Sequence, residues 1–341
     1  MKLNHMFSSI LAVLCSFPLT GTFAQPPPSS GSIEVIATFD YPGTGNQTLP
    51  QKINGKGDVV GVFIDSTGVE RGFIRYSDGS FSAPIADPND TAGFTEGRGI
   101  TNSGLVVGDY LISDGTIHSF FLSGSTFTEY DVPGTVQTNF LGINDPGDAT
   151  GGFDPDGSGV FQGFILDRHG VVTSFAVPGA GGTFAYELSN TNKLLVGYFV
   201  DSSGILHGYY RDAAGALHFP IDPTGSVATI LFGLNEKNLV VGRYSDSSGV
   251  THGLFFGLPS SFFTFDYPGA TFTSLNGINS NGTVCGRYVD ASGIAHGFLA
   301  RVKGKLPLTS MGMKTKTTVA PSQVVSLDSS SAAWGNATPA R

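Results

Sequence analysis

The sequence predicts an all-β protein, a six-bladed β-propeller with four-stranded blades that is closed by its N-terminal strand. The first observation is a phrase that recurs six times, with its cleanest copy running from Gly277 to Tyr288. One glycine of the phrase marks each copy: Gly61, Gly108, Gly151, Gly197, Gly242 and Gly286. These glycines are 47, 43, 46, 45 and 44 residues apart. A near-constant period of this length is typical of propeller blades.

The second observation is the composition. The 341 residues include 48 Gly and 27 Phe but 1 Trp, and charged residues make up 13%. Globular proteins usually hold about 25% charged residues. Aromatic and β-branched side chains suit a pleated, half-buried surface, so this balance favours strands. The formal net charge of -9 argues against a nucleic-acid partner, which would need a basic stripe.

Residues 1–24 form a separate segment. Lys2 supplies a positive start, residues 10–19 are apolar, and Thr22 and Ala24 place small residues before a cleavage point near Ala24. This pattern predicts a secretory signal peptide, so we expect the mature protein to be extracellular or periplasmic. Residues 25–32 predict a Pro/Ser linker. The mature chain keeps one cysteine, Cys285, which we expect to be a buried apolar side chain.

Each repeat offers four short strands. The first ends at an Ile-Asn pair such as Ile143-Asn144, and the others follow the patterns of residues 240–244, 251–256 and 265–268. The turn after the first strand begins at residues whose side chains can cap it: Asn54, Thr101, Asn144, Asn190, Asn235 and Asn279. Three positions later stand Gly57, Gly104, Gly147, Lys193, Asn238 and Gly282. Gly and Asn tolerate a positive φ, so five of these six fit a left-handed turn position.

The third observation concerns the two ends of the repeat region. The last repeat stops near Arg301 without a fourth strand, whereas residues 35–41 form a fourth strand that lacks its own first three. Pairing the two completes six blades and removes the exposed sheet edges. The sequence therefore predicts one propeller over residues 33–304.

Residues 305–341 are rich in Ser, Thr, Ala and Lys and show no apolar periodicity. We expect a disordered tail. It holds no hydrophobic run that could anchor the chain, so we expect no membrane span. We also expect a monomer.

The repeated pieces Gly-Ile-Asn, Val-Val-Gly-x-Tyr, Asp-x-x-Gly, His-Gly-Phe and Phe-x-Asp-x-Pro-Gly occur in one order over residues 33–301. This pattern resembles the HAF-type extracellular repeat family of bacterial secreted proteins. The resemblance implies a secreted bacterial protein. It implies no particular reaction, because the family brings no established catalytic residues.

The histidines of the third strand are the first candidate for chemistry. Four blades have a histidine at the same position of the third strand: His118, His207, His252 and His296. The other two blades have Arg71 and Gln162 there. Equivalent positions of different blades lie too far apart to share one metal ion at about 2 Å. We interpret them as structural, each hydrogen-bonded within its own blade.

A weak calcium candidate is the turn that holds Asp154, Asp156 and Ser158, where two carboxylates lie close together. A calcium loop normally supplies more acidic ligands, so a hydrogen-bonded turn is the favoured reading. We expect no other cofactor.

Departures from the repeat are the better functional hints. Glu96, Arg98 and Glu187, together with Lys52, stand where the repeat has no charge. We expect them at the mouth of the central channel, where Glu96, Arg98 and Glu187 could meet. The alternative is ordinary drift of a degenerate repeat. No nucleophile elbow, phosphate-binding loop, dinucleotide fingerprint or zinc motif is present.

Three functions fit these observations. The first is a secreted binding module for an extracellular glycan or protein, favoured by the regular repeats and the missing catalytic signature. The second is a hydrolase or lyase that acts on an extracellular polysaccharide or lactone, with Glu96 or Glu187 as acid or base. The third is a structural envelope component whose channel is filled by side chains. The missing catalytic signature makes an enzyme the less favoured interpretation.

Overall fold

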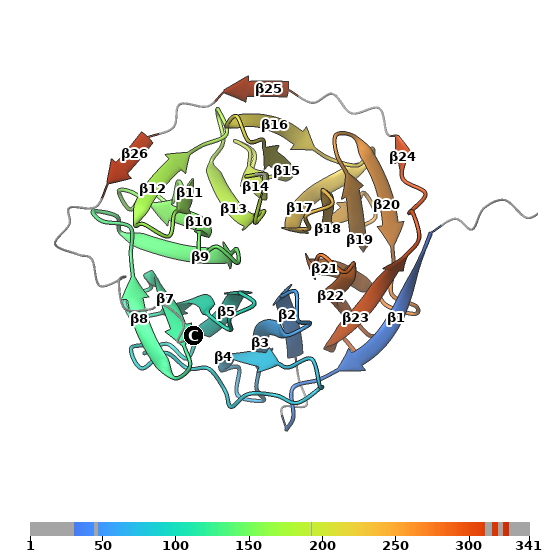
Figure 1. Ribbon diagram of the computed structural model, residues 1–341, viewed down its shortest axis with the longest axis horizontal. Helices are drawn as coiled ribbons and strands as arrows, with labels where there is room; N and C mark the ends of the chain where they lie inside the picture. Colours follow the sequence, from blue (N-terminus) through green and yellow to red (C-terminus); the bar gives the residue numbers. More distant parts are fainter. Residues whose placement is uncertain (1–30, 44–46, 192, 311–315, 320–322, 327–341) are drawn as a thin grey trace, which may run out of the picture.

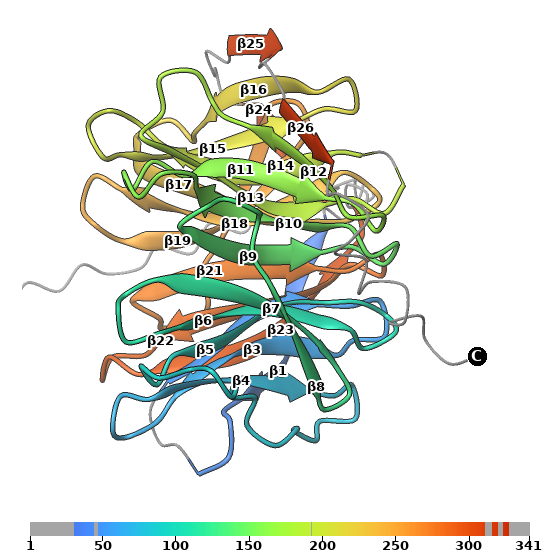
Figure 2. The ribbon, with the colours of Figure 1, turned by 90° about the vertical axis from the view of Figure 1, so that its left-hand side faces the viewer.

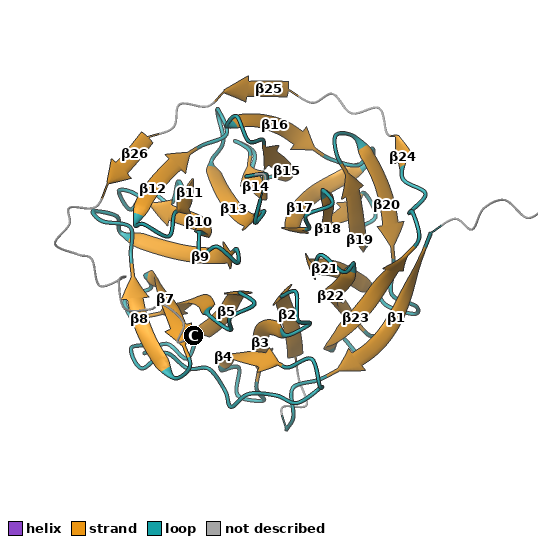
Figure 3. Ribbon diagram, in the orientation of Figure 1, coloured by secondary structure: helices purple, strands orange, loops and turns teal. Residues whose placement is uncertain are grey.

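The computed structural model describes residues 31–43, 47–191, 193–310, 316–319 and 323–326. These residues form strands and turns around a central channel, with no helix among them (Figures 1 and 3). No helix in this described part is therefore long and apolar enough to cross a membrane. The predicted signal peptide and residues 25–30 of the predicted linker lie outside the described residues.

Six blades surround the channel, each an antiparallel meander. The inner strands are β2 (Gln47–Ile53), β5 (Thr95–Ile100), β9 (Gln137–Ile143), β13 (Gly182–Leu188), β17 (Ser226–Leu234) and β21 (Phe272–Ile278). The second strands are β3 (Val59–Ile64), β6 (Val106–Leu111), β10 (Ala149–Asp154), β14 (Leu195–Val200), β18 (Leu239–Asp246) and β22 (Thr283–Val289). The third strands are β4 (Glu70–Arg75), β7 (Ile117–Ser123), β11 (Gln162–Leu166), β15 (Leu206–Arg211), β19 (Thr251–Gly257) and β23 (Ala295–Lys303).

The outer strands complete the blades. Blades 2 to 5 have β8 (Thr126–Tyr130), β12 (Val171–Phe175), β16 (Ala216–Ile221) and β20 (Ser261–Phe265). In blade 6 the outer strand is β1 (Ser32–Phe39), which pairs antiparallel with β23 so that Ile33 faces Val302. The predicted closure by the N-terminal strand is thus confirmed. In blade 1 the outer strand is reduced to two isolated bridges, Arg75 with Phe81 and Gly72 with Ile85.

The repeated glycine of each second strand is required by space. A Cβ atom at Gly61 would lie 2.5 Å from the carbonyl oxygen of Leu49 and 2.9 Å from the ring of Phe73. The other five glycines likewise lie against a carbonyl oxygen of their inner strand. The buried Phe73 comes from the His-Gly-Phe position of the third strand. The repeat period therefore records the close approach of three neighbouring strands in every blade.

The turns behave as the sequence predicts. The five positions expected to adopt a positive φ do so, including Asn238 at 59°, and Lys193 adopts one as well, at 55°. One cap was misplaced by a residue, because the turn of blade 4 is one residue longer than the others. Ser189, rather than Asn190, donates its backbone N–H to the far side of the turn, to the carbonyl oxygen of Leu194.

Every inner strand contains a β-bulge near its end. A bulge inserts one unpaired residue and turns its side chain in a new direction. The inserted residues differ in every blade: Gln51, Arg98, Leu141, Tyr186, Phe232 and Asn276. At this bulge the blades therefore have the same backbone conformation but different side chains.

The segment after blade 6 departs from the predicted disordered tail. Three short strands lie along the outside of the propeller and add a further antiparallel strand to blades 5, 4 and 3 (Figure 2). These are β24 (Thr309–Ser310), β25 (Lys316–Val319) and β26 (Gln323–Ser326). Their backbones use the open edges of β20, β16 and β12, which need no apolar pattern. Residues 327–341 lie outside the described part.

Candidate functional site in the central channel

One end of the channel is closed by the turns that follow the inner strands. A cavity of about 70 Å³ lies there, lined by these turns from all six blades. Asn54 donates a hydrogen bond to the carbonyl oxygen of Thr101 at 3.1 Å, and Asn279 to that of Asn54 at 3.0 Å. Asn144 and Asn235 reach the next blade in the same way, at 3.4 Å. The capping residues thus also join four pairs of neighbouring blades within the ring of turns.

Beneath this ring a salt bridge crosses the channel. Lys52 of β2 lies 2.5 Å from a carboxylate oxygen of Glu187 on β13, and it also donates to the carbonyl oxygen of Phe232. These strands belong to blades 1 and 4, which face each other across the channel (Figure 1). Burial raises the pKa of Glu187, and Lys52 opposes that rise. Glu187 also lines the cavity at the turns, so the bridge lies at this end of the channel.

The other predicted charges lie deeper. Arg98 of β5 forms an ion pair with Glu96, and its Nε lies 3.1 Å from a carboxylate oxygen of Asp109. Glu96 and Arg98 belong to β5, an inner strand, and Glu187 lines the cavity at the turns. The expected position at the mouth of the channel stays a prediction. Glu187 also lies within its strand. Among the described residues, no hydrogen bond or ion pair joins it to Glu96 or Arg98.

A ladder of aromatic rings lines the channel from blade 3 to blade 5. Phe161 stacks on Phe184 with centroids 5.0 Å apart, and Phe184 stacks on Tyr198 at 4.8 Å. Tyr198 then contacts Tyr186 at 5.8 Å, and Tyr186 meets Phe232 edge-on at 5.0 Å. Together these five residues form what we call the aromatic ladder. Its rings are half-buried except Phe232, which is buried.

Glycine makes room for the start of this ladder. A Cβ atom at Gly152 of β10 would lie 2.8 Å from the ring of Phe184 and 3.3 Å from that of Phe161. Any larger residue at this position would therefore displace the stacked pair. Gly152 directly follows the repeated glycine of blade 3 and is the counterpart of Tyr198 in blade 4.

Two arginines continue the ladder into blades 5 and 6. The guanidinium carbon of Arg243 on β18 lies 5.4 Å from the ring centroids of both Phe232 and Phe272. That of Arg287 on β22 lies 5.5 Å from the same Phe272 ring. Burial, followed by the nearby charge of Arg243, lowers the pKa of Arg287 to about 10, so both remain cations at neutral pH. We call Arg243 and Arg287 the arginine pair.

A second cavity adjoins Arg243. It has a volume of about 110 Å³ and is lined by Arg243, Phe272 and Ile230, among others. Phe272 is the first residue of its inner strand, so this cavity lies at the opposite end of the channel from the turns that close it. The two cavities thus differ in chemistry: the first is lined mainly by polar turn residues, and the second by Arg243, two aromatic rings and several aliphatic and hydroxyl side chains.

The sequence reasoning missed the arginine pair, although a signal was present. Both arginines directly follow the repeated glycine of the second strand. At this position blades 1 to 4 have Val62, Asp109, Gly152 and Tyr198, and blades 5 and 6 have Arg243 and Arg287. Five of these residues, all but Val62, occur in the contacts described above. A position that varies while its neighbours in the repeat stay similar indicates a side chain that the fold does not require.

The weak calcium candidate is a hydrogen-bonded loop. Carboxylate oxygens of Asp154 accept backbone N–H groups of Asp156, Gly157 and Gly159 at 3.2, 3.0 and 2.8 Å. Asp156 accepts the N–H of Ser158 at 3.1 Å. No group of three His, Cys, Asp or Glu side chains suited to a metal ion occurs in the described part of the chain. Calcium binding stays a prediction.

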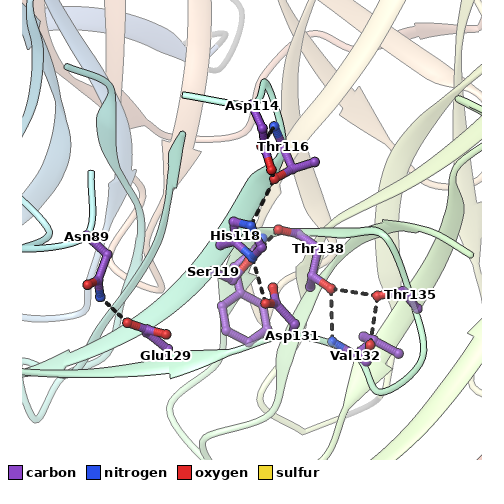
Figure 4. Close-up of polar contacts among 11 residues, drawn as sticks. Asn89, Asp114, Thr116, His118, Ser119, Glu129, Asp131, Val132, Thr135 and Thr138 are labelled. Carbon is purple, nitrogen blue, oxygen red and sulfur yellow. Dashed lines mark hydrogen bonds and ion pairs between the residues drawn. The ribbon is translucent and has the colours of Figure 1, made fainter. Parts of the chain in front are cut away.

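The third-strand histidines bind aspartates of their own blades. His118 Nδ1 lies 2.7 Å from Asp131 of the outer connection, as Figure 4 shows. The same pair recurs in three other blades: His207 with Asp222, His252 with Asp266 and His296 with Asp40. In blade 1, Arg71 forms the equivalent contact with Asp90 at 3.1 Å. These contacts support the structural interpretation of the histidines.

No protein-family model and no curated protein sequence matches this chain. Solved structures with a similar fold include AofleA from Arthrobotrys oligospora, with 12% identity and a TM-score of 0.49 over 89% of this chain and 94% of that one. A variant of the Aleuria aurantia lectin bound to α-methyl-L-fucoside is 12% identical, with a TM-score of 0.44 over 83% of this chain and 97% of that one. The BP39L lectin from Burkholderia pseudomallei is 11% identical, with a TM-score of 0.38 over 76% and 98%. At this identity the likeness concerns the fold alone.

Proposed function

We propose that this protein is a secreted binding module for an extracellular glycan, and that a sugar unit binds against the channel wall of blades 4 to 6. The observation that carries the proposal is the aromatic ladder, continued by Phe272 and the arginine pair and adjoining the 110 Å³ cavity. Rings and cations arranged along one wall are not explained by the repeat.

The chemistry of this wall suits a sugar. A sugar ring has apolar C–H faces that pack on aromatic rings and a rim of hydroxyl groups that need hydrogen-bond partners. Binding sites for such ligands combine apolar and aromatic walls with a few well-placed polar groups. Here Tyr186 and Tyr198 offer both a ring and a hydroxyl, and the cations add donors.

The hydrolase or lyase alternative has less support. Glu96 is engaged by Arg98, and Glu187 by Lys52 on the far side of the channel. A pair of catalytic carboxylates would have to face one bound sugar from the two sides of its bond. The third alternative, a structural component with a filled channel, fits the Lys52–Glu187 bridge but leaves the second cavity unexplained.

The proposal is tested by titrating the mature protein with a panel of neutral and acidic oligosaccharides by calorimetry. The variant Phe161→Ala removes the first ring of the ladder, and we expect it to weaken binding about tenfold. Phe161 is half-buried in a loop, so the fold should tolerate its loss. Tyr76→Ala is the matched control, because Tyr76 is a 41% exposed aromatic residue outside the ladder.

Binding of one oligosaccharide class that Phe161→Ala weakens and Tyr76→Ala does not would support the proposal. Binding that neither variant changes would place the site elsewhere. Failure of the folded protein to bind any glycan of the panel would contradict the proposal and favour a protein partner or a structural role.

A further inference from the structure

Resting on the proposed glycan function, we infer that the arginine pair binds an oxyanion on the sugar, a carboxylate or a sulfate group, and so selects acidic glycans. The oxyanion would lie beside Phe272, within reach of the guanidinium groups of Arg243 and Arg287. Neutral sugars would bind the aromatic ladder alone and more weakly.

The first reason is that these guanidinium groups have no acceptor in the protein. Each guanidinium carries five N–H donors in a fixed fork. In the described part of the chain, neither Arg243 nor Arg287 donates a side-chain hydrogen bond or lies within 4.0 Å of a carboxylate. Both make contact with aromatic rings instead.

The second reason is the charge balance of the channel. Its other two cations are matched: Lys52 by Glu187, and Arg98 by Glu96 and Asp109. The remaining groups near the arginine pair that can titrate are the phenols of Tyr186 and Tyr198, whose pKa values burial raises, so they are neutral at neutral pH. Among the described residues, Arg243 and Arg287 therefore have no carboxylate partner of their own, and the four cations of the channel exceed its three paired carboxylates by one.

The third reason is an unused polar side chain beside them. Ser274 on β21 stands opposite Arg287 in the strand register. Its hydroxyl oxygen is buried and has no hydrogen-bond partner, and neither has the amide oxygen of Asn276, two residues further along. Buried polar groups are normally paired, so an unpaired hydroxyl next to an unpaired guanidinium indicates a ligand position.

The chemistry favours an oxyanion over other ligands. Guanidinium forks match carboxylate and related oxyanions with two parallel hydrogen bonds. Such bonds are stronger in a site shielded from water than at the surface. The aromatic rings beneath the arginines hold their planes in place without consuming their N–H groups.

The test compares an oligogalacturonate, its carboxyl-reduced counterpart and a sulfated galactan oligosaccharide by calorimetry. We expect the uronate, the sulfated sugar or both to bind at least about tenfold more tightly than the reduced sugar. Arg243→Gln and Arg287→Gln should each remove most of this difference, because they weaken binding of the acidic sugar much more than binding of the reduced sugar. Arg301→Gln, at an exposed arginine of β23, is the matched control and should change nothing.

A separate arm distinguishes this inference from the proposed function. Free glucuronate and inorganic sulfate are tested by thermal unfolding, and we expect one of them to raise the unfolding temperature of the parent protein but not of the double variant Arg243→Gln/Arg287→Gln. Equal affinity for acidic and reduced sugars would overturn the inference and leave the glycan proposal standing. If the parent protein binds no glycan but the free anion still raises its unfolding temperature, the glycan proposal would be overturned instead.

Discussion

In the outer half of the blades the same contacts recur around the ring, whereas along the channel the side chains at equivalent positions vary from blade to blade. The pairs His118–Asp131, His207–Asp222 and His252–Asp266 are copies of one contact. The inserted residues of the inner bulges share only their backbone position. Both regions are built from the same repeat, so the difference reflects what each region does.

The comparison separates two roles of the repeat. The recurring positions solve the same packing problem in each blade, and a change at one of them should lower stability. The variable positions lie where the backbone shape is already set by the bulge, and a change there should alter binding with little loss of stability. Residues that serve binding are often not the residues that would give the highest stability.

The largest expected effect comes from a substitution at a recurring position. Gly61→Ala would force a Cβ atom against the carbonyl oxygen of Leu49, and we expect a loss of about 3 kcal/mol in the free energy of unfolding. Gly68→Ala is the matched control in the same blade, because its Cβ would meet nothing within 4 Å and only its φ of +84° is strained. It should cost about 1 kcal/mol. Equal losses in denaturant unfolding would refute the packing explanation.

The next effect concerns the bridge across the channel. Lys52→Met would leave Glu187 buried without a partner, and we expect a loss of about 3 kcal/mol at neutral pH. Burial holds the pKa of Glu187 above its usual value, so the protonated form is favoured in the folded protein. The deficit should therefore shrink as the pH falls through the raised pKa of Glu187, because the carboxylate then takes up a proton in the folded protein.

The control for this bridge is a double variant. Lys52→Met with Glu187→Leu removes both charges, and we expect it to regain most of the lost stability at neutral pH. A double variant as unstable as Lys52→Met, or a deficit that does not change with pH, would mean that the buried carboxylate is not the cause. Urea unfolding at several pH values measures both.

The smallest effect belongs to a single outer pair. Burial lowers the pKa of His252, but its hydrogen bonds to Asp266 and Asp246 outweigh this and raise the pKa above its usual value. The pair thus stabilises the fold below about pH 6.5 and loses that contribution as the pH rises through the raised pKa. His252→Ala should cost about 0.5 kcal/mol at pH 5 and less at pH 8. A cost that grows with pH would contradict this account.

The fold was predictable because a propeller repeats one local problem six times. The glycine, the His-Gly-Phe piece and the turn residues each act within a blade, so their spacing along the chain indicates their structure. The closing pair of β1 and β23 followed from counting strands. The one-residue slip at Asn190 arose because a longer turn in blade 4 shifts its cap without disturbing the flanking strands.

The site was harder to predict because its contacts join different blades. Lys52 and Glu187 come from opposite blades, and Arg243 meets Phe272 of the next blade. Nothing in the local pattern states which inner residues face each other across the channel. The outer strands β24 to β26 escaped prediction for a related reason, since they depend on free edges of distant strands rather than on their own composition.

The measurement that tests the account most directly is the free energy of unfolding of the double variant Arg243→Gln/Arg287→Gln without any ligand. If these side chains serve binding alone, removing two like charges that have no acceptor should leave the free energy of unfolding equal to that of the parent protein or raise it. A loss of about 2 kcal/mol or more would show that the arginine pair is part of the structural frame, and would contradict the division between a recurring scaffold and a variable binding wall.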